Sequence, residues 1–325
     1  MLRSSPSDSD GPVIGIDLGG TNITAGLVDS DNRIIERTKI DTAADEGPEA
    51  VLERVADVID ELLKKSNYSR SEMVGVGLGV PGAVDANTGV VLEAVNLRWR
   101  DLHLTEHLAT KTDLAVTVDN DVNVGTWGEY ELGAARGCTG VLGIFVGTGI
   151  GGGLILNGSL HTGVFGTAGE IGHTIIQSGA PFGARTVERL ASRTAIVNRL
   201  VALVEANEKS EIRELAGKKW PRIRSKVLKK ALAADDTLTL RVLGDAAKVI
   251  GHAAASAVTL LSLDCVVIGG GLTEALDDRW VQWIRDNFLD AVFPDVCRQC
   301  KVVAAELEDD AGLIGAALLA RRRLG

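Results

Sequence analysis

The stretch VIGIDLGGTN, residues 13–22, gives the first indication of the fold. Its apolar first half is typical of a short buried strand, which ends at a turn formed by Gly19 and Gly20. Glycines at such a turn let the backbone approach an anion closely and point N–H groups at it. Asp17 would be repelled by phosphate, so we expect it to hold Mg²⁺ through water, while Thr21 offers a hydroxyl donor. The stretch therefore predicts a phosphate loop.

A second glycine-rich stretch, GTGIGGG at residues 147–153, follows another apolar strand expected over residues 139–146. Two such turns, both with a threonine and one with an acidic residue, favour phosphate binding over ordinary tight turns. Neither matches the Walker A pattern or a dinucleotide-binding fingerprint. A third run, Gly269–Gly271, follows the apolar strand that begins at Cys265. Two interpretations of it stay open, a backbone surface for a flat adenine or a strand-to-helix turn.

The remaining elements repeat one pattern. In the first half we expect strands over residues 12–17, 23–28, 33–40, 74–80 and 115–119, and a helix over 47–65. In the second half we expect strands over 139–146, 153–156, 159–161 and 301–305, and a strand that begins at Cys265 and leads into the glycine turn ending at residue 271. We also expect a largely helical region over 186–262 and a closing helix over 312–323. A strand, turn, hairpin and helix thus appear twice, each time with a glycine loop after the first strand.

This repetition predicts a duplicated α/β fold with a cleft between the two halves. We expect a smaller domain of residues 12–119 plus 312–325, a larger domain of residues 120–311, and a disordered tail over residues 1–11. The tail is polar with no hydrophobic stretch behind it, so it is not a signal peptide, and no apolar run is long enough to span a bilayer. A cytoplasmic enzyme is the resulting expectation.

Composition excludes some classes of function. The 325 residues are 45% hydrophobic and 24% charged, as in ordinary globular proteins, and the net charge is −10. An acidic surface repels nucleic acid, although a local nest of N–H groups can still hold a nucleotide. Cys297 and Cys300 are closely spaced but lack further ligands for zinc, so reduced thiols are favoured over a disulfide. The basic segment of residues 218–230 is interpreted as a solvated helical hairpin.

The three glycine motifs together resemble the sugar kinases of the actin-like ATPase superfamily, whose domains have a ribonuclease H-like fold. The motifs are DLGGT at 17–21, GTGIG at 147–151 and IGGG at 268–271. The sequence AGEIGH at 168–173 is similar to a motif of the ROK family, which contains bacterial glucokinases, related hexose kinases and sugar-responsive repressors. The resemblance runs from about Val13 to the end. It includes GVPG at 79–82, NLRW at 96–99, NDVN at 120–123, and Glu188 with the following Ala191 and Ser192.

The resemblance implies a role for each matching residue. Asp121 would be the general base on the sugar hydroxyl, since phosphoryl transfer uses a carboxylate to orient and deprotonate its nucleophile. The sugar would contact Gly79, Pro81, Gly82, Asn96, Asn120, Asp121, Glu170, His173 and Glu188. ATP would contact Asp17, Gly19, Gly20, Thr21, Asn22, Gly147, Thr148, Gly149, Gly151, Gly269, Gly270 and Gly271, with Mg²⁺ at Asp17. Family members are commonly dimers, or tetramers built from dimers.

Two of these motifs also have structural explanations. Asn120 and Asp121 could simply cap a helix, and His173 could be a satisfied core histidine. For either motif alone, the structural explanation would be favoured over a role in function. Because both motifs occur together with the phosphate loops, the functional explanation is favoured instead.

One departure from the family concerns zinc. Family members usually carry three cysteines after the AGEIGH motif, which bind structural Zn²⁺ together with the histidine. The corresponding residues 175–188 read IIQSGAPFGARTVE and contain no cysteine. We therefore expect no zinc site, and we expect packing by Pro181 and Phe182 to hold this loop. The change also leaves the sugar preference open.

The leading hypothesis is an ATP-dependent hexokinase acting on the 6-hydroxyl of glucose. The alternatives are fructose, mannose, N-acetylmannosamine or another amino sugar as acceptor, and polyphosphate as donor. A sugar-sensing regulator is the non-enzymatic alternative. A repressor is disfavoured because only about eleven residues precede the first strand, too few for a helix-turn-helix domain, and because the net charge is acidic. A module that only binds sugar would be expected to lack the carboxylate of Asp121, which is present.

Overall fold

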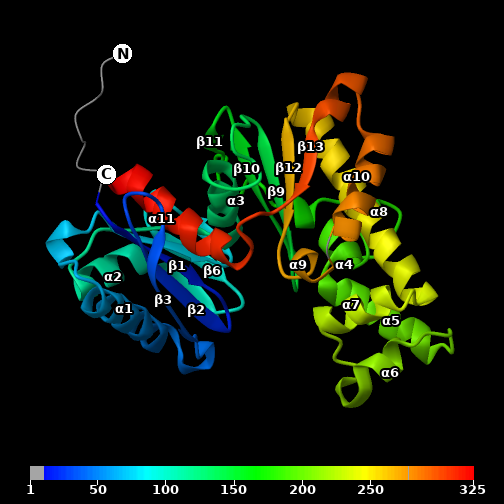
Figure 1. Cartoon of the computed structure of the whole chain (residues 1–325), viewed down its shortest axis with the longest axis horizontal. Coiled ribbons are helices and arrows are strands. Elements are labelled where there is room, and N and C mark those ends of the chain that lie inside the picture. The colour runs from blue at the N-terminus through cyan, green and yellow to red at the C-terminus, as the bar shows by residue number, and fades with distance from the viewer. Residues whose placement is uncertain (1–10, 277) are drawn as a thin grey trace. The chain divides into compact units, whose positions relative to one another are not determined.

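The computed structural model describes residues 11–276 and 278–325 (Figure 1). Of the predicted disordered tail, all but Gly11 lies outside these residues. Contacts divide the described chain into two compact units, one of residues 11–136, 160–168 and 309–325 and the other of residues 137–159 and 169–308. The sequence placed the domain boundary after residue 119, whereas the contacts place residues 120–136, with the helix that they contain, in the first unit. Within the described chain no helix combines the length and apolarity needed to cross a bilayer.

The first unit is built on a five-stranded sheet with the strand order β3-β2-β1-β4-β8. The strands are β1 (Val13–Leu18), β2 (Asn22–Val28), β3 (Ile34–Asp41), β4 (Gly75–Val80) and β8 (Val116–Asn120). β1, β2 and β3 form an antiparallel meander, whereas β4 runs parallel to β1 and β8 runs parallel to β4. The carboxyl ends of β1, β4 and β8 therefore meet at one edge of the sheet.

Helices pack against this sheet, and the strands supply apolar side chains and glycines where the helices contact them. Side chains of β1 and β4 that include Ile14, Ile16 and Leu78 form one buried core with α1 (Pro48–Lys65) and α2 (Leu104–Thr112). α11 (Ala311–Leu324) packs against β1 and β4. Gly77 permits this contact, because a Cβ atom there would lie 2.0 Å from the carbonyl oxygen of Ala316. Successive strand residues point to opposite faces, so apolar residues alternate with glycines.

Further elements of the first unit follow β4 and β8. β5 (Ala83–Asp85), β6 (Val90–Ala94) and β7 (Trp99–His103) form a small antiparallel sheet. α3 (Asp121–Glu131) starts directly after β8 and packs against α11. At their crossing a Cβ atom on Gly315 would lie 1.7 Å from the carbonyl oxygen of Val124, so the helices touch through their backbones.

The second unit is built on another five-stranded sheet, with the strand order β11-β10-β9-β12-β13. The strands are β9 (Val141–Val146), β10 (Ile150–Leu156), β11 (Ser159–Leu160), β12 (Cys265–Gly269) and β13 (Lys301–Ala304). β9 and β10 form a hairpin, and β12 runs parallel to both β9 and β13. Asn157 and Gly158 both have positive φ, which confirms the turn expected there.

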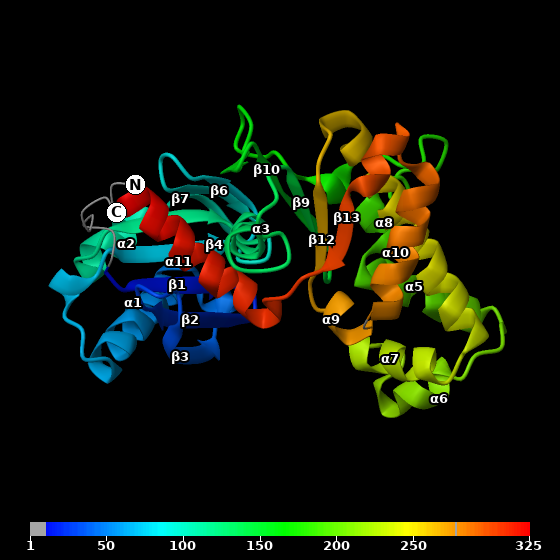
Figure 2. The ribbon, with the colours of Figure 1, turned by 45° about the horizontal axis from the view of Figure 1, so that its top comes forward.

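The helices of the second unit lie on one face of this sheet in Figure 2. They are α4 (Val187–Ala191), α5 (Arg193–Glu205), α6 (Ile212–Ala216), α7 (Ser225–Ala233), α8 (Thr237–Leu261), α9 (Thr273–Leu276) and α10 (Asp278–Ala291). α8 packs along α10, and both contribute to a core that includes Ile144, Ile268 and Phe288. The strands and helices predicted from sequence are present, with strand ends displaced by at most three residues, the largest displacement being at the start of β10. The strands β5, β6 and β7 and the helices α2, α9 and α10 were not predicted.

Candidate active site

The first glycine loop follows β1 and is held by backbone contacts. The amide of Gly19 donates to the carbonyl oxygen of Asn22 at 2.9 Å, and the hydroxyl of Thr42 donates to the carbonyl oxygen of Gly19 at 2.7 Å. Gly20 lies against Asn96, since a Cβ atom on Gly20 would be 3.3 Å from the Cβ of Asn96. The loop and Asn96, which the sequence assigned to nucleotide and sugar respectively, are therefore neighbours within the first unit.

Strand register brings the other first-unit residues to the same edge. Asp17 pairs with Gly79 in the β1/β4 ladder, and Gly79 pairs with Asp119 in the β4/β8 ladder. The side-chain amide of Asn120 donates to the carbonyl oxygen of Gly82 at 3.0 Å, which fixes the turn that contains Pro81. Ligands of open α/β sheets bind outside the carboxyl ends of parallel strands, and this edge has that geometry.

Asn120 and Asp121 form the start of α3. The side-chain oxygen of Asn120 accepts hydrogen bonds from the amides of Val122 and Asn123, at 2.9 and 3.1 Å. Asn120 is therefore a helix cap, and this structural role exists beside any role in binding. Asp121 is the first residue of the helix and is half-buried at the strand edge.

Asp17 and Asp121 influence each other electrostatically. Burial, together with the negative charges of Asp121 and Asp309, raises the pKa of Asp17 to about 7, against the opposing effect of the positive charge of Lys39. Two carboxylates that repel each other at a polar edge suit a hard divalent cation, which would relieve the repulsion. The donor set therefore fits Mg²⁺ at Asp17. No cluster of three or more metal-ligating side chains occurs among residues 11–276 and 278–325.

A buried ionic cluster supports this edge and was not predicted. Asp119 is 2% exposed, and its carboxylate accepts hydrogen bonds from Arg323 of α11 at 2.5 Å and from the side chain of Asn123 at 2.8 Å. The amide of Asn120 also donates to Asp119, at 2.8 Å. The signal in the sequence was an aspartate inside an apolar strand, which needs a partner when buried. Its partner lies 204 residues away and could not be identified from spacing.

The second glycine loop is shorter than its sequence suggested. Gly151, Gly152 and Gly153 belong to β10 and pair with β9, so the turn itself consists of Gly147 to Gly149. The amide of Gly147 donates to the carbonyl oxygen of Gly149 at 2.9 Å. The expectation that strand structure resumes at residue 153 is wrong, because β10 already starts at Ile150.

Side chains from α4 and α5 hold this turn. The carboxylate of Glu188 accepts a hydrogen bond from the amide of Ile150 at 2.9 Å. The guanidinium group of Arg193 donates to the hydroxyl of Thr148 at 2.6 Å, and the hydroxyl of Thr194 donates to the carbonyl oxygen of Thr148 at 2.7 Å. Glu188, assigned to the sugar from the sequence, thus contacts the second glycine loop within its own unit.

Glu170 precedes a short 3-10 turn of the second unit, Ile171–His173, and His173 is its last residue. Their side chains are 50% and 67% exposed, and the His173 Nε2 lies 4.0 Å from a carboxylate oxygen of Glu170. His173 is therefore not a core histidine. The two side chains together present a carboxylate and an imidazole to solvent, which suits recognition of hydroxyl groups.

The third glycine run lies beside the second loop. Gly269 ends β12 opposite Phe145 of β9, and the amide of Leu272 donates to the carbonyl oxygen of Val146 at 3.0 Å. Gly270 has a φ of 86°, and a Cβ atom there would lie 2.7 Å from the backbone of Val146, so only glycine fits. Gly271 faces open space. Gly270 is thus needed for the turn, whereas Gly271 leaves room for a ligand.

Backbone hydrogen bonds hold the loop of residues 175–188. Ile175 and Thr186 form a β-bridge, and the amide of Ile176 donates to the carbonyl oxygen of Arg185 at 2.9 Å. Phe182 is 93% exposed and contacts the guanidinium group of Arg185, 4.5 Å from the ring centroid. The expectation that Phe182 holds the loop by packing is therefore wrong.

All four cysteines are free thiols. Burial raises the pKa of Cys300 to about 12, and burial together with the neighbouring Cys138 raises that of Cys265. Such thiols are poor nucleophiles at neutral pH.

The model of the ROK family matches residues 13–323. The chain belongs to the ROK family. A glucokinase of Halalkalibacterium halodurans is 34% identical over 97% of this chain and 96% of its own length. A putative xylose repressor of Caldicellulosiruptor sp. is 29% identical over 94% of this chain and 77% of its own length.

A solved structure shows the same architecture. The crystal structure of a ROK-family glucokinase from Streptomyces griseus in complex with glucose and AMPPNP has a TM-score of 0.82. It is 30% identical and covers 96% of this chain and all of its own. The protein therefore has the two-domain actin-like ATPase fold of ROK kinases, and its relatives support a sugar kinase enzyme.

Proposed function

We propose that the protein transfers the terminal phosphoryl group of ATP to the 6-hydroxyl of glucose. The observation that carries the proposal is the position of Asp121 at the carboxyl edge of the first sheet. There it is electrostatically coupled to Asp17 and adjacent to the turn of residues 79–82. The similarity to glucokinases over nearly the whole chain supports the choice of substrate.

In the proposed reaction Asp121 accepts the proton of the sugar hydroxyl as its oxygen bonds to the terminal phosphorus. The bond from that phosphorus to the bridging oxygen breaks, and ADP leaves. Asn96, Asn120 and the residues 79–82 would orient the sugar from the first unit. Glu170 and His173 would bind its other hydroxyls from the second unit, as would the carboxylate oxygen of Glu188 that does not contact Ile150.

The donor would be held by the backbone amides of the two glycine loops. Asp17 would hold Mg²⁺ through water, and the ion would neutralise charge on the phosphates. Thr148, fixed by Arg193 and Thr194, would direct its loop toward the phosphates.

The identity of the sugar rests on the second unit. The side chains of Glu170 and His173 are half exposed or more, which leaves several sugar epimers open as acceptors. Mannose, fructose and N-acetylmannosamine are therefore the competing acceptors, and a regulatory role comparable to that of the repressor relative is the competing function.

An assay with purified protein, ATP and Mg²⁺ tests the proposal. ADP release is measured with glucose, mannose, fructose and N-acetylmannosamine, a reaction without sugar gives the background of ATP hydrolysis, and the product is identified by NMR. We expect glucose to give the highest kcat/KM and a 6-phosphate product. The absence of a phosphorylated product from every sugar would refute the kinase, and a higher kcat/KM with another sugar would correct the acceptor.

A further inference from the structure

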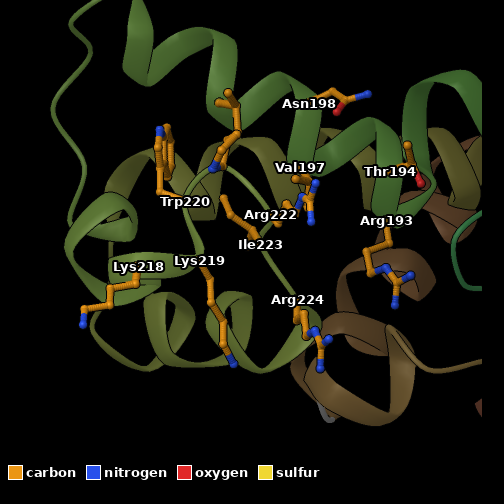
Figure 3. A pocket seen from close by; sticks show the side chains of 12 residues that line it. Arg193, Thr194, Val197, Asn198, Lys218, Lys219, Trp220, Arg222, Ile223 and Arg224 are labelled. Atoms are coloured by element: carbon orange, nitrogen blue, oxygen red, sulfur yellow. The ribbon is translucent and has the colours of Figure 1, made fainter.

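Two segments of the chain are rich in basic residues, and they differ in what they contact. The first is the segment of residues 218–230 in the second unit, whose lysines and arginines are all exposed, as the sequence predicted. Figure 3 shows residues 218–224 of this segment opposite α5. The second is the run Arg321–Arg323 at the end of α11 in the first unit. Each of these three arginines contacts a different element of that unit.

Arg321 contacts the end of the first sheet that lies away from the proposed reaction centre. Its guanidinium group donates to the carbonyl oxygen of Asp29 at 2.7 Å and to the side chain of Asn32. Both partners belong to the turn between β2 and β3. Because the end of β2 pairs with the start of β1, this turn lies at the opposite end of that strand from Asp17. Arg321 therefore anchors α11 at the amino end of β1.

Arg322 contacts the helix that begins with Asp121. Its guanidinium carbon lies 4.7 Å from the ring centroid of Trp127, a residue of α3 that is 1% exposed. A cation over the face of an aromatic ring is attracted by the negative charge of that face. This contact therefore joins the end of α11 to α3.

Arg323 contacts the strand that leads directly into Asp121. It donates to the carboxylate of Asp119 at 2.5 Å and to a carbonyl oxygen of β8 at 3.2 Å. Asp119 also accepts hydrogen bonds from the backbone amide of Asn120 and the side chain of Asn123, both at 2.8 Å. One buried carboxylate thus joins the end of α11 to the last residue of β8 and to the first turn of α3.

The position of Asp121 depends on this junction. Asp121 is the first residue of α3, so its backbone continues from the strand end that Asp119 holds. Its own carboxylate accepts a hydrogen bond from the amide of Val122 at 2.9 Å, which directs the side chain relative to the helix start. A general base must lie within hydrogen-bond reach of the attacking hydroxyl, and a displacement of about 1 Å can lower the rate about a hundredfold.

We propose that Arg323 is a positioning residue for phosphoryl transfer, which holds the proposed base Asp121 in place through Asp119. The inference rests on the proposed function for the role of Asp121. It assigns to the arginine run of α11 a task beyond the stability of the fold. Arg321 and Arg322 fix the helix, and Arg323 connects it to the reaction centre.

Amide hydrogen exchange, followed by mass spectrometry, tests the anchor without any need for activity. The variant is Arg323→Ala, and the matched control is Arg321→Ala, which removes the neighbouring arginine of the same helix. Thermal melting curves verify that both variants fold. We expect exchange in residues 119–125 to become about tenfold faster in Arg323→Ala and less than about twofold faster in Arg321→Ala, because a charged hydrogen bond is lost locally. Equal acceleration in both variants would overturn the anchor.

Steady-state kinetics with glucose and ATP test the role of Arg323 in the reaction. We expect Arg323→Ala to lower kcat about 10–100-fold, with both KM values changed by less than about twofold, since a misplaced base impairs transfer and not binding. Arg323→Lys keeps the positive charge and should recover part of the loss. Arg321→Ala should leave kcat unchanged. An active enzyme whose kcat is normal in Arg323→Ala would overturn the inference and leave the proposed function standing.

A double variant separates positioning from a general loss of structure. If Arg323 acts through Asp121, then Arg323→Ala should change kcat by less than about twofold in a protein that already carries Asp121→Asn. A loss of full size in that background would overturn the positioning role. Absence of transfer by the unaltered protein would refute the proposed function and with it the role of Arg323 in the reaction, whereas the exchange measurement would still decide whether Arg323 anchors the residues around Asp121.

Discussion

The two glycine loops have similar sequences but are supported in different ways. The first follows β1 at an edge where Asp119, Arg323 and Asn123 form a buried cluster. The second is held by polar side chains near the surface, and the nearby Glu170 and His173 are half exposed or more. The difference teaches that the residues proposed for the reaction centre are fixed by the interior of a sheet. The residues proposed to choose between substrates lie on short exposed segments, which can change at little cost in stability.

Replacement of Asp121 by asparagine should give the largest effect on activity. The amide keeps the size of the side chain but cannot accept the proton of the sugar, so kcat should fall by about 10²–10⁴-fold with little change in sugar binding. Steady-state kinetics and calorimetric titration with glucose measure the two quantities. Asp113→Asn, an exposed C-cap of α2 in the same unit, is the control and should leave kcat unchanged. An Asp121→Asn enzyme of normal kcat would remove Asp121 from the mechanism.

The buried ion pair behind the first loop should give the next largest effect, on stability. Arg323→Ala leaves the carboxylate of Asp119, whose side chain is 3% exposed, without its cation. Loss of one partner of a buried pair costs about 3 kcal/mol or more in the free energy of unfolding.

Arg199→Ala serves as the comparison in the second unit. It breaks the ion pair of Arg199 with Asp245, whose side chains are both about half exposed. This change should cost no more than about 1 kcal/mol. Denaturation by urea measures both values, and equal losses would contradict the difference in support between the units.

The sequence was sufficient for the parts of the fold that depend on local patterns. Apolar runs predicted the strands of both sheets, and Asn157-Gly158 predicted the hairpin turn, since these signals involve adjacent residues. The short strands β5, β6 and β7 escaped prediction because their buried residues are few and irregularly spaced.

Contacts between distant residues could not be predicted. Asp119 and Arg323 are separated by most of the chain, and Phe182 was expected to pack because its hydrophobicity suggested burial. The run of glycines after Gly149 looked like a loop, since nothing local shows that β10 must pass close to residues 169–172. These features depend on which segments meet in space, and periodicity contains no information about that.

The exposed pair of the second unit should give the smallest effect, confined to substrate affinity. His173→Ala removes a side chain that is 67% exposed, so the free energy of unfolding should change by less than about 0.5 kcal/mol. If His173 contributes one hydrogen bond to the sugar, KM for glucose should rise about fivefold, whereas kcat should fall little because the residue does not contact the reacting oxygen. Kinetics with glucose and mannose, alongside urea denaturation, measure these changes. His107→Ala, at a histidine of the first unit whose side chain is 42% exposed, is the control. A large loss of stability in His173→Ala, or a fall in kcat as deep as that of Asp121→Asn, would show that the second half of the site is not the adaptable part.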